Sequence, residues 1–517
     1  MIKATIHPIK DFPWHPYLLA IFPTLALLAY NIAEIKMAEA LRSFLVSLAA
    51  AIMLTVVLRL LVKDLNKAAV ISSFAFVLFF SYGHIYNILE TNSLAGMSIG
   101  RHRILAPIYL VIFGIGVWWI ARPNRKLGLL PQTLNIVALA AVALPVLQIS
   151  VDYIQESRAF AAEPTYAPQD LHIAGDKPAP DIYYIILDAY SRDDIMKDFY
   201  NFDNSSFLNN LTSLGFYVAR CSQSNFAQTQ LSLASALNME FIDESGGDFS
   251  PEQTRRVGIP RLIKRSTARR LLESLGYKMV AFETGYSWTQ VEDADVYLSP
   301  KSTTVSLLDV TGGLNSFEAL LIKTSAMLIV VDGTSVLPRF LQLDMNYPHQ
   351  IHRERVLFTL DQLGKLPTVP GPKFIFAHIV SPHRPFVFGS QGEIVKQEKD
   401  DIIGYRDQVA YLNSRLIPLL RKIISNSSTP PIIILQGDHG GLDTSEQERM
   451  AILNAYYLPE DGNQLLYENI SPVNTFRLVF NHYFGTRYDL QEDISYFSSY
   501  QYPYQYTVIP NARSGCP

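Results

Sequence analysis

The 517-residue chain contains only two cysteines, Cys221 and Cys516. Two thiols cannot form a disulfide framework or a thiolate metal cluster, so a disulfide-stapled small fold is excluded. Charged residues are scarce at 17%, against about 25% in an ordinary soluble domain. The formal charge of −4 gives no general positive field, so we expect no nucleic-acid partner. Hydrophobic residues reach 49%, and they are concentrated at the front of the chain.

The first third contains five apolar runs with little or no charge. Each run is close to the ~20 residues that a helix needs to cross a hydrocarbon core of ~30 Å. Buried helices of a soluble bundle would show polar faces at helical spacing, and these runs lack them. We therefore predict a transmembrane domain over residues 1–154, with helices at residues 15–33, 42–62, 68–89, 104–121 and 131–152.

Lysine and arginine are unevenly divided between the two sides of these helices. One side carries Lys3, Lys10, Arg59, Lys63, Lys67, Arg122, Arg125 and Lys126. The other side carries Lys36, Arg42, Arg101 and Arg103. The richer side is expected to be cytoplasmic, so the chain after Asp152 lies outside the plasma membrane. If the first segment is instead a signal peptide cleaved near residues 38–40, the four remaining helices lead to the same location.

The character of the chain changes after the last apolar run. Residues 155–180 contain four prolines and no apolar periodicity, which predicts a linker. From 181 to 517, helix-like stretches alternate with short apolar runs at residues 182–187, 216–219, 278–282, 374–379, 432–435 and 451–458. This alternation predicts an α/β domain with a largely parallel central sheet. Ligands of such sheets bind beyond the carboxyl ends of the strands.

Polar residues follow two of the predicted strands. The stretch QGDHGG at residues 436–441 comes directly after the run 431–435. Its Asp438 and His439 would form half of a divalent metal site, with glycines that allow close backbone approach. A plain polar turn is the alternative. Asp188 follows the run 182–187, where it is either a metal ligand or a helix N-cap.

Two further stretches carry reactive or anion-binding groups. Thr229 follows SNFAQ and opens a helix-like segment, a position that a helix N-cap also takes. The stretch HIVSPHRP at residues 378–385 places His378, His383 and Arg384 in a proline-bounded loop. Imidazole and guanidinium groups suit a phosphate-like anion. A rigid surface loop is the alternative.

Together and in this order, these four pieces resemble the alkaline phosphatase superfamily. The resemblance is closest to its membrane-anchored, sulfatase-like branch, which includes lipoteichoic-acid synthases and phosphoethanolamine transferases, and it covers about residues 181–485. It implies a metal site formed by Asp188, Thr229, Asp438 and His439, with Thr229 as the catalytic nucleophile. It also implies substrate contacts from His378, His383, Arg384 and Asn225. Further pocket candidates on the same ground are Arg192, Arg449 and Arg477.

The resemblance implies a metal-dependent transferase. It would move a phosphoglycerol- or phosphoethanolamine-like head group from a membrane lipid to an extracytoplasmic glycan or lipid acceptor, through a phosphothreonine. One divalent cation is expected, and mixed ligation admits zinc or manganese first, then magnesium or calcium. A phosphodiesterase or sulfuric ester hydrolase on the same site is one alternative, and a catalytically inactive scaffold or binding protein is another.

The cysteines depart from the sulfatase pattern. Sulfatases of this superfamily carry C-x-P-S-R, whose cysteine is oxidised to formylglycine. Cys221 begins CSQSN, without the proline and arginine, and lies eight residues before Thr229. This argues against a formylglycine sulfatase. Because Cys221 and Cys516 would both lie outside, one disulfide and two unpaired thiols both stay open.

Overall fold

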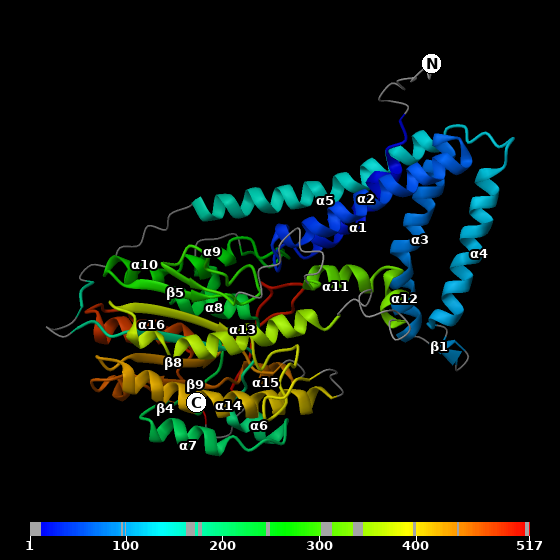
Figure 1. Ribbon diagram of the computed structural model, residues 1–517. Coiled ribbons are helices and arrows are strands. Elements are labelled where there is room, and N and C mark those ends of the chain that lie inside the picture. The colour runs from blue at the N-terminus through cyan, green and yellow to red at the C-terminus, as the bar shows by residue number, and fades with distance from the viewer. Residues whose placement is uncertain are drawn as a thin grey trace. The chain divides into compact units, whose positions relative to one another are not determined.

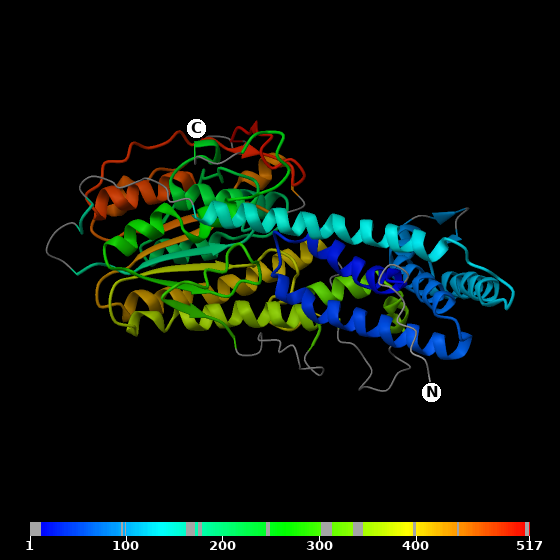
Figure 2. The same ribbon diagram turned by 90° about the horizontal axis from the view of Figure 1, so that it is seen from above.

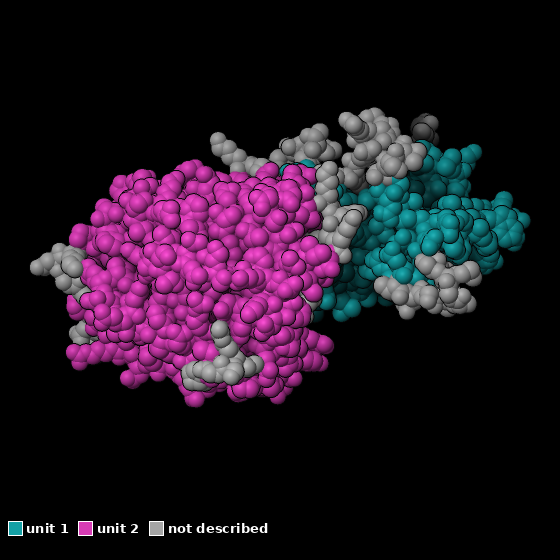
Figure 3. Space-filling model, turned by 90° about the horizontal axis from the view of Figure 1, so that it is seen from below, with its two compact units in different colours: residues 1–154, 305–348 teal, residues 155–304, 349–517 magenta. Residues whose placement is uncertain are grey.

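The computed structural model describes residues 12–91, 93–94, 97–98, 100–161, 171–173, 178–244, 249–300, 313–333, 345–395, 400–441, 444–511 and 516. The chain divides into two compact units (Figure 3). Unit 1 consists of Met1–Ile154 with Val305–Pro348, and unit 2 consists of Gln155–Thr304 with His349–Pro517. Residues 305–348, which the sequence analysis assigned to the domain 181–517, group here with the N-terminal helices.

Unit 1 has a helix at each of the five predicted apolar runs (Figure 1). They are α1 (His15–Tyr30), α2 (Met37–Val62), α3 (Leu65–Thr91), α4 (His102–Ala121) and α5 (Leu130–Ala161). Within the described residues, α2 to α5 are long and apolar enough to cross a membrane. The chain is thus a multi-pass membrane protein. The exception to the prediction is α1, whose 16 residues span about 24 Å, less than a hydrocarbon core of ~30 Å.

The inserted segment of unit 1 contains two short helices, α11 (Ser316–Lys323) and α12 (Met327–Asp332). Asn315 and Glu318 form a capping box at the start of α11, and Arg42 of α2 forms an ion pair with Glu318. Phe317 packs in one apolar cluster with Leu28 and Ala40. An apolar side chain and a buried ion pair therefore explain why this segment belongs to unit 1.

Unit 2 is built on a seven-stranded sheet of order β4-β9-β8-β3-β7-β5-β6. The strands are β3 (Ile182–Leu187), β4 (Tyr217–Val218), β5 (Lys278–Phe282), β6 (Val296–Leu298), β7 (Lys373–Ile379), β8 (Ile432–Gly437) and β9 (Asn454–Tyr457). The five strands from β8 to β6 are parallel, whereas β9 runs antiparallel to both β8 and β4. The predicted fold class, apolar helices followed by an α/β domain, is confirmed.

Helices cover both faces of this sheet (Figure 2). One face packs against α8 (Thr229–Asn238), α9 (Ile259–Lys264), α10 (Thr267–Ser274) and α16 (Pro472–Tyr483). The other packs against α7 (Ser205–Ser213), α13 (Tyr347–Leu363) and α14 (Asp401–Asn426). Tyr184 of β3 points into the first layer and Tyr183 into the second. Burial on both faces is why these strands read as continuous apolar runs.

The first residues of the predicted linker belong to a helix. Helix α5 continues to Ala161, and the Glu156 carboxylate accepts a hydrogen bond from the Gly258 backbone N–H at 3.1 Å. Residues 155–161 are therefore helical. Residues 162–170, which include Pro164 and Pro168, and residues 174–177 lie outside the described residues.

The C-terminal segment is joined to the rest of unit 2 by the disulfide Cys221–Cys516. This answers the question that the sequence left open about the two thiols. The Asn511 side chain also donates to the Cys221 carbonyl at 2.7 Å. A two-stranded ribbon, β10 (Tyr496–Phe497) with β11 (Thr507–Val508), lies in the same segment.

Candidate active site

The sheet brings the predicted metal ligands together at one edge. In the parallel register, Leu187 at the end of β3 is opposite Gly437 of β8 and Ile379 of β7. Asp188 and Asp438 are the next residues after Leu187 and Gly437, so their side chains leave neighbouring strand ends. A ligand site beyond the carboxyl ends of parallel strands is the arrangement expected for this fold class.

Asp188, Asp438 and His439 form a compact, buried group of metal-ligand type. One ligand atom from each lies within 4.8 Å of the others. His439 Nε2 is 3.7 Å from Asp188 Oδ1 and 3.5 Å from Asp438 Oδ2. All three side chains are at most 2% exposed.

Each carboxylate binds the protein through one oxygen and directs the other into the group. Asp188 Oδ2 lies 3.2 Å from His378 Nε2, and Asp438 Oδ1 accepts the Ala189 N–H at 2.9 Å. Asp188 Oδ1 and Asp438 Oδ2 are buried and have no hydrogen-bond partner in the described part of the chain. Buried charged oxygens without partners are costly, and a divalent cation would satisfy both. The residues present therefore fit such an ion.

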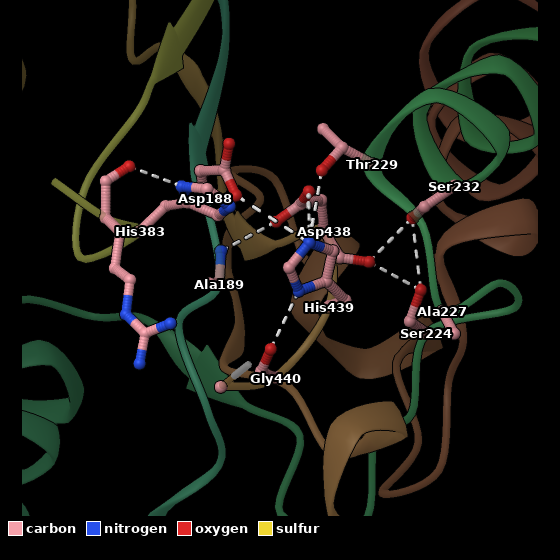
Figure 4. A network of polar contacts seen from close by, with 12 residues as sticks. Asp188, Ala189, Ser224, Ala227, Thr229, Ser232, His383, Asp438, His439 and Gly440 are labelled. Carbon is pink, nitrogen blue, oxygen red and sulfur yellow. Dashed lines mark hydrogen bonds and ion pairs between the residues drawn. The ribbon is translucent and has the colours of Figure 1, made fainter. Parts of the chain in front are cut away.

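His439 is oriented as a metal ligand. Its Nδ1 lies 2.7 Å from the Gly440 carbonyl, which can only accept, so Nδ1 carries the proton and Nε2 offers a lone pair to the group (Figure 4). Burial lowers the pKa of His439, although the charge of Asp438 opposes this. A neutral ring with Nδ1–H bonded to a carbonyl is the usual state of a metal-binding histidine.

Thr229 lies beside the group formed by Asp188, Asp438 and His439, and it is the first residue of α8. The residue is half-buried, and its hydroxyl lies 3.1 Å from His439 Nε2; Figure 4 marks this contact. The preceding N-cap residue, Gln228, makes no side-chain cap hydrogen bond. Backbone N–H groups at a helix start favour a bound anion, so a phosphoryl group beside Thr229 would be stabilised from that direction.

Two serines that the sequence analysis did not single out hold the turn that carries Asp438. The Ser224 and Ser232 hydroxyls donate to the Asp438 carbonyl at 2.5 Å and 2.7 Å (Figure 4). Ser232 lies three residues after Thr229, so both project from the same face of α8. This spacing is the signal that could have identified Ser232.

Glycines allow this turn to pack against a neighbouring backbone. A Cβ on Gly437 would lie 2.5 Å from the Tyr190 carbonyl oxygen. A Cβ on Gly440 would lie 2.7 Å from the carbonyl oxygen of Glu448 and 2.9 Å from that of Ala451. Because backbone atoms cannot move aside like a flexible side chain, only glycine fits here.

Replacing Gly440 with alanine is expected to displace the Asp438–His439 turn and to destabilise the protein by about 1–3 kcal/mol, the usual cost of overpacking. Thermal unfolding and metal content of the purified full-length protein measure both effects. Gly114→Ala is the control, because a Cβ there meets no atom within 4 Å. A Gly440→Ala protein with unchanged stability and metal content would show that the close contact is unimportant.

The electrostatics around Asp188 favour its charged form. Burial alone would raise the pKa of Asp188, but nearby histidines outweigh it and the pKa lies below its ordinary value. The largest contributions come from His383 and from His378, whose Nε2 lies 3.2 Å from Asp188 Oδ2. An ionised carboxylate is the form that binds a cation.

The sequence predicted His378, His383 and Arg384 in one loop, but His378 lies within strand β7, and only His383 and Arg384 lie in the loop that follows it. His378 is 2% exposed and contacts Asp188 Oδ2 and, at 3.4 Å through Nδ1, the Thr289 hydroxyl. It supports a ligand instead of facing a substrate. His383 is half-buried, donates its backbone N–H to the Asp188 carbonyl, and has Nδ1 2.6 Å from the Arg384 carbonyl. Arg384 forms an ion pair with Asp401 at 2.5 Å.

Asn225 lies apart from this group. It is fully buried, and its amide donates to Ser471 Oγ and the Ile494 carbonyl and accepts the Val473 N–H. These bonds use the whole amide for packing, so we do not retain Asn225 as a substrate-binding residue.

Of the three arginine candidates, two bind backbone carbonyls away from the Asp188 group and one lies beside it. Arg192 and Arg477 donate to backbone carbonyls of Ser222 and Met239. Arg449 donates to the Ala227 carbonyl at 2.9 Å, and its charge acts on the pKa of His439. Arg449 is therefore the one that lies beside the group.

No family model and no curated protein matches the chain. Among solved structures, the periplasmic domain of EptC from Escherichia coli matches with a TM-score of 0.41 and 12% identity, over 68% of this chain and 98% of that one. The lipooligosaccharide phosphoethanolamine transferase A of Neisseria meningitidis matches with 0.36 and 11%, over 90% and 93%. An alkaline phosphatase superfamily protein of Vibrio parahaemolyticus matches with 0.39 and 11%, over 68% and 82%.

One of these structures is described as a protein of the alkaline phosphatase superfamily, and another as an integral membrane phosphoethanolamine transferase. At such identities and TM-scores the likeness says nothing about the reaction. Any conclusion about activity therefore depends on the residues of this chain.

Proposed function

We propose that this protein is a membrane-anchored, metal-dependent transferase. It moves a phospho head group, of phosphoglycerol or phosphoethanolamine type, from a membrane lipid to an extracytoplasmic glycan or lipid acceptor. The observation that carries the proposal is the Thr229 hydroxyl at a helix start, 3.1 Å from His439 Nε2, beside two buried carboxylate oxygens that lack hydrogen-bond partners in the described residues.

Asp188, Asp438 and His439, with Thr229, would hold the cation. When bound, a divalent cation lowers the pKa of a coordinated hydroxyl and takes up charge on a phosphoryl group. Carboxylate, hydroxyl and imidazole ligands together suit zinc or manganese first. The partnerless oxygens and the His439 tautomer support this assignment.

Thr229 acts as the nucleophile. Its Oγ forms a bond to phosphorus while the bond from phosphorus to the lipid oxygen breaks, and the proton lost by the hydroxyl ends on the released lipid alcohol. The N-terminus of α8 and the side chains of His383, Arg384 and Arg449 stabilise the non-bridging oxygens. An acceptor hydroxyl then attacks the phosphothreonine and restores Thr229.

The membrane anchor and the disulfide support the location. The distribution of lysine and arginine places unit 2 outside the cytoplasm, and disulfides such as Cys221–Cys516 persist in oxidising compartments. External protease should therefore cleave unit 2 in sealed, right-side-out vesicles. Cleavage only in inside-out vesicles would reverse the orientation.

Peptide mass mapping after incubation with a mixed lipid extract tests the function. We expect an adduct on the Thr229 peptide of the purified full-length protein, with a mass that identifies the transferred group. The adduct should disappear when an acceptor is added. A folded, metal-loaded protein that turns over phosphodiester without any adduct would favour a hydrolase with water as direct nucleophile, and no turnover would favour an inactive scaffold.

A further inference from the structure

Unit 2 has a cavity of about 150 Å³ at the end of α8 that lies opposite Thr229. The helix begins at Thr229 and ends at Asn238, so at 1.5 Å per residue its ends are about 14 Å apart. Asn238 and Met239 line the cavity. It is therefore separate from the Asp188 group.

The lining of this cavity is strongly positive. It contains four arginines and a single acidic residue, Glu240; the arginines are Arg261, Arg265, Arg270 and Arg477. The pKa of Arg261 is lowered, first by burial and then by the charge of Arg265. Guanidinium groups that repel one another in this way would be stabilised by an anion between them.

Hydrogen bonds tie the walls of the cavity together. The Asn238 amide donates to the Leu262 carbonyl of α9 at 2.7 Å and accepts the Thr267 N–H of α10 at 2.9 Å. Arg477 of α16 donates through Nε to the Met239 carbonyl at 2.7 Å. One buried amide and one arginine thus fix four helices, so the arginines are presented by a rigid frame.

We propose that this cavity is a binding site for a phosphate-bearing group, distinct from the site at Thr229. Guanidinium groups bind phosphate oxygens through paired N–H donors. The Thr267 hydroxyl, which also lies in the lining, donates to Asn238 Oδ1 at 3.1 Å and accepts from Arg270 at 3.2 Å, so it holds the Arg270 guanidinium at the wall. The proposal does not require Thr229 to be a nucleophile.

A lipid head group is the favoured source of that phosphate. The Arg265 guanidinium lies 5.8 Å from the ring centre of Phe160, which belongs to the last turn of α5. Phe160 follows Val151, the end of the last uncharged run, by nine residues. Arg265 therefore lies beside the last turn of α5, the helix that carries the final apolar segment. A head group held there would keep a lipid beside the catalytic unit.

Calorimetric titration of the full-length Thr229→Ala protein in a neutral detergent tests this site. The probes are dihexanoyl phosphatidic acid and inorganic phosphate, with EDTA present so that no cation at Asp188 contributes. We expect saturable binding of the lipid, weakened at least tenfold by the double substitution Arg261→Gln with Arg265→Gln. The control, Arg421→Gln with Lys422→Gln, makes the same charge change at exposed positions of α14 and should bind like the parent.

Arg265→Glu provides a second variant, because Arg265 is exposed and its replacement spares the fold. It should also lose at least tenfold in affinity. Unchanged binding in both pocket variants would overturn the proposal. Lipid binding at least tenfold tighter than inorganic phosphate supports a lipid source, and equal affinities would overturn that source. A missing adduct on wild-type Thr229 would refute the proposed reaction and leave these expectations unchanged.

Discussion

Replacing Thr229 with alanine is expected to abolish adduct formation and to reduce turnover by at least ~10³-fold, the scale of losing a catalytic nucleophile. The hydroxyl lies 3.1 Å from His439 Nε2, and the Thr229 side chain is half-buried at the start of α8. Its loss removes few packing contacts, so thermal unfolding should change little. Product release and adduct mass are measured on the same preparation.

Thr229→Ser is the matched variant for this prediction. Serine retains the hydroxyl and loses only a methyl group, so it should still form the adduct. If activity depended on the shape of the helix start instead of on the hydroxyl, serine and alanine would behave alike. A Thr229→Ala protein with full turnover would exclude Thr229 as the nucleophile.

Much of the candidate metal site could be predicted because its residues follow strands that are buried on both faces. The runs 182–187 and 432–435 are continuously apolar, and parallel strands place the residues that follow them at one edge. Asp188 and Asp438 are therefore neighbours although 250 residues separate them. Strand β6, at Val296–Leu298, was missed because three residues are too short to show a period.

The roles of Asn225 and His378 could not be predicted, because they depend on partners far away in the sequence. Ser471 and Ile494 use up the Asn225 amide, and Asp188 turns His378 into a supporting residue. The grouping of residues 305–348 with unit 1 could not be predicted either, because it also depends on contacts between residues far apart in the sequence. The pairing of Arg42 with Glu318 leaves no periodic pattern in either segment.

Replacing Asp438 with asparagine is expected to weaken metal binding by at least ~100-fold, because second-shell changes alone cost 10–100-fold. Asparagine keeps an oxygen that can accept the Ala189 N–H, as Asp438 Oδ1 does at 2.9 Å. It removes the negative charge from the buried Oδ2 position, which has no hydrogen-bond partner among the described residues. Elemental analysis and titration with zinc or manganese measure the loss.

The same substitution should leave the metal-free protein at least as stable as the wild type. A buried carboxylate without a counter-charge is costly, and asparagine removes that cost. In wild-type protein, metal at 100 times its Kd would add about 2.7 kcal/mol of stability, and this gain should vanish in the variant. Asp361→Asn is the control, since the exposed Asp361–Lys365 pair contributes at most about 1 kcal/mol. If Asp438→Asn destabilised the metal-free protein while its metal content stayed unchanged, Asp438 would be a structural residue and the cation would have to be held elsewhere.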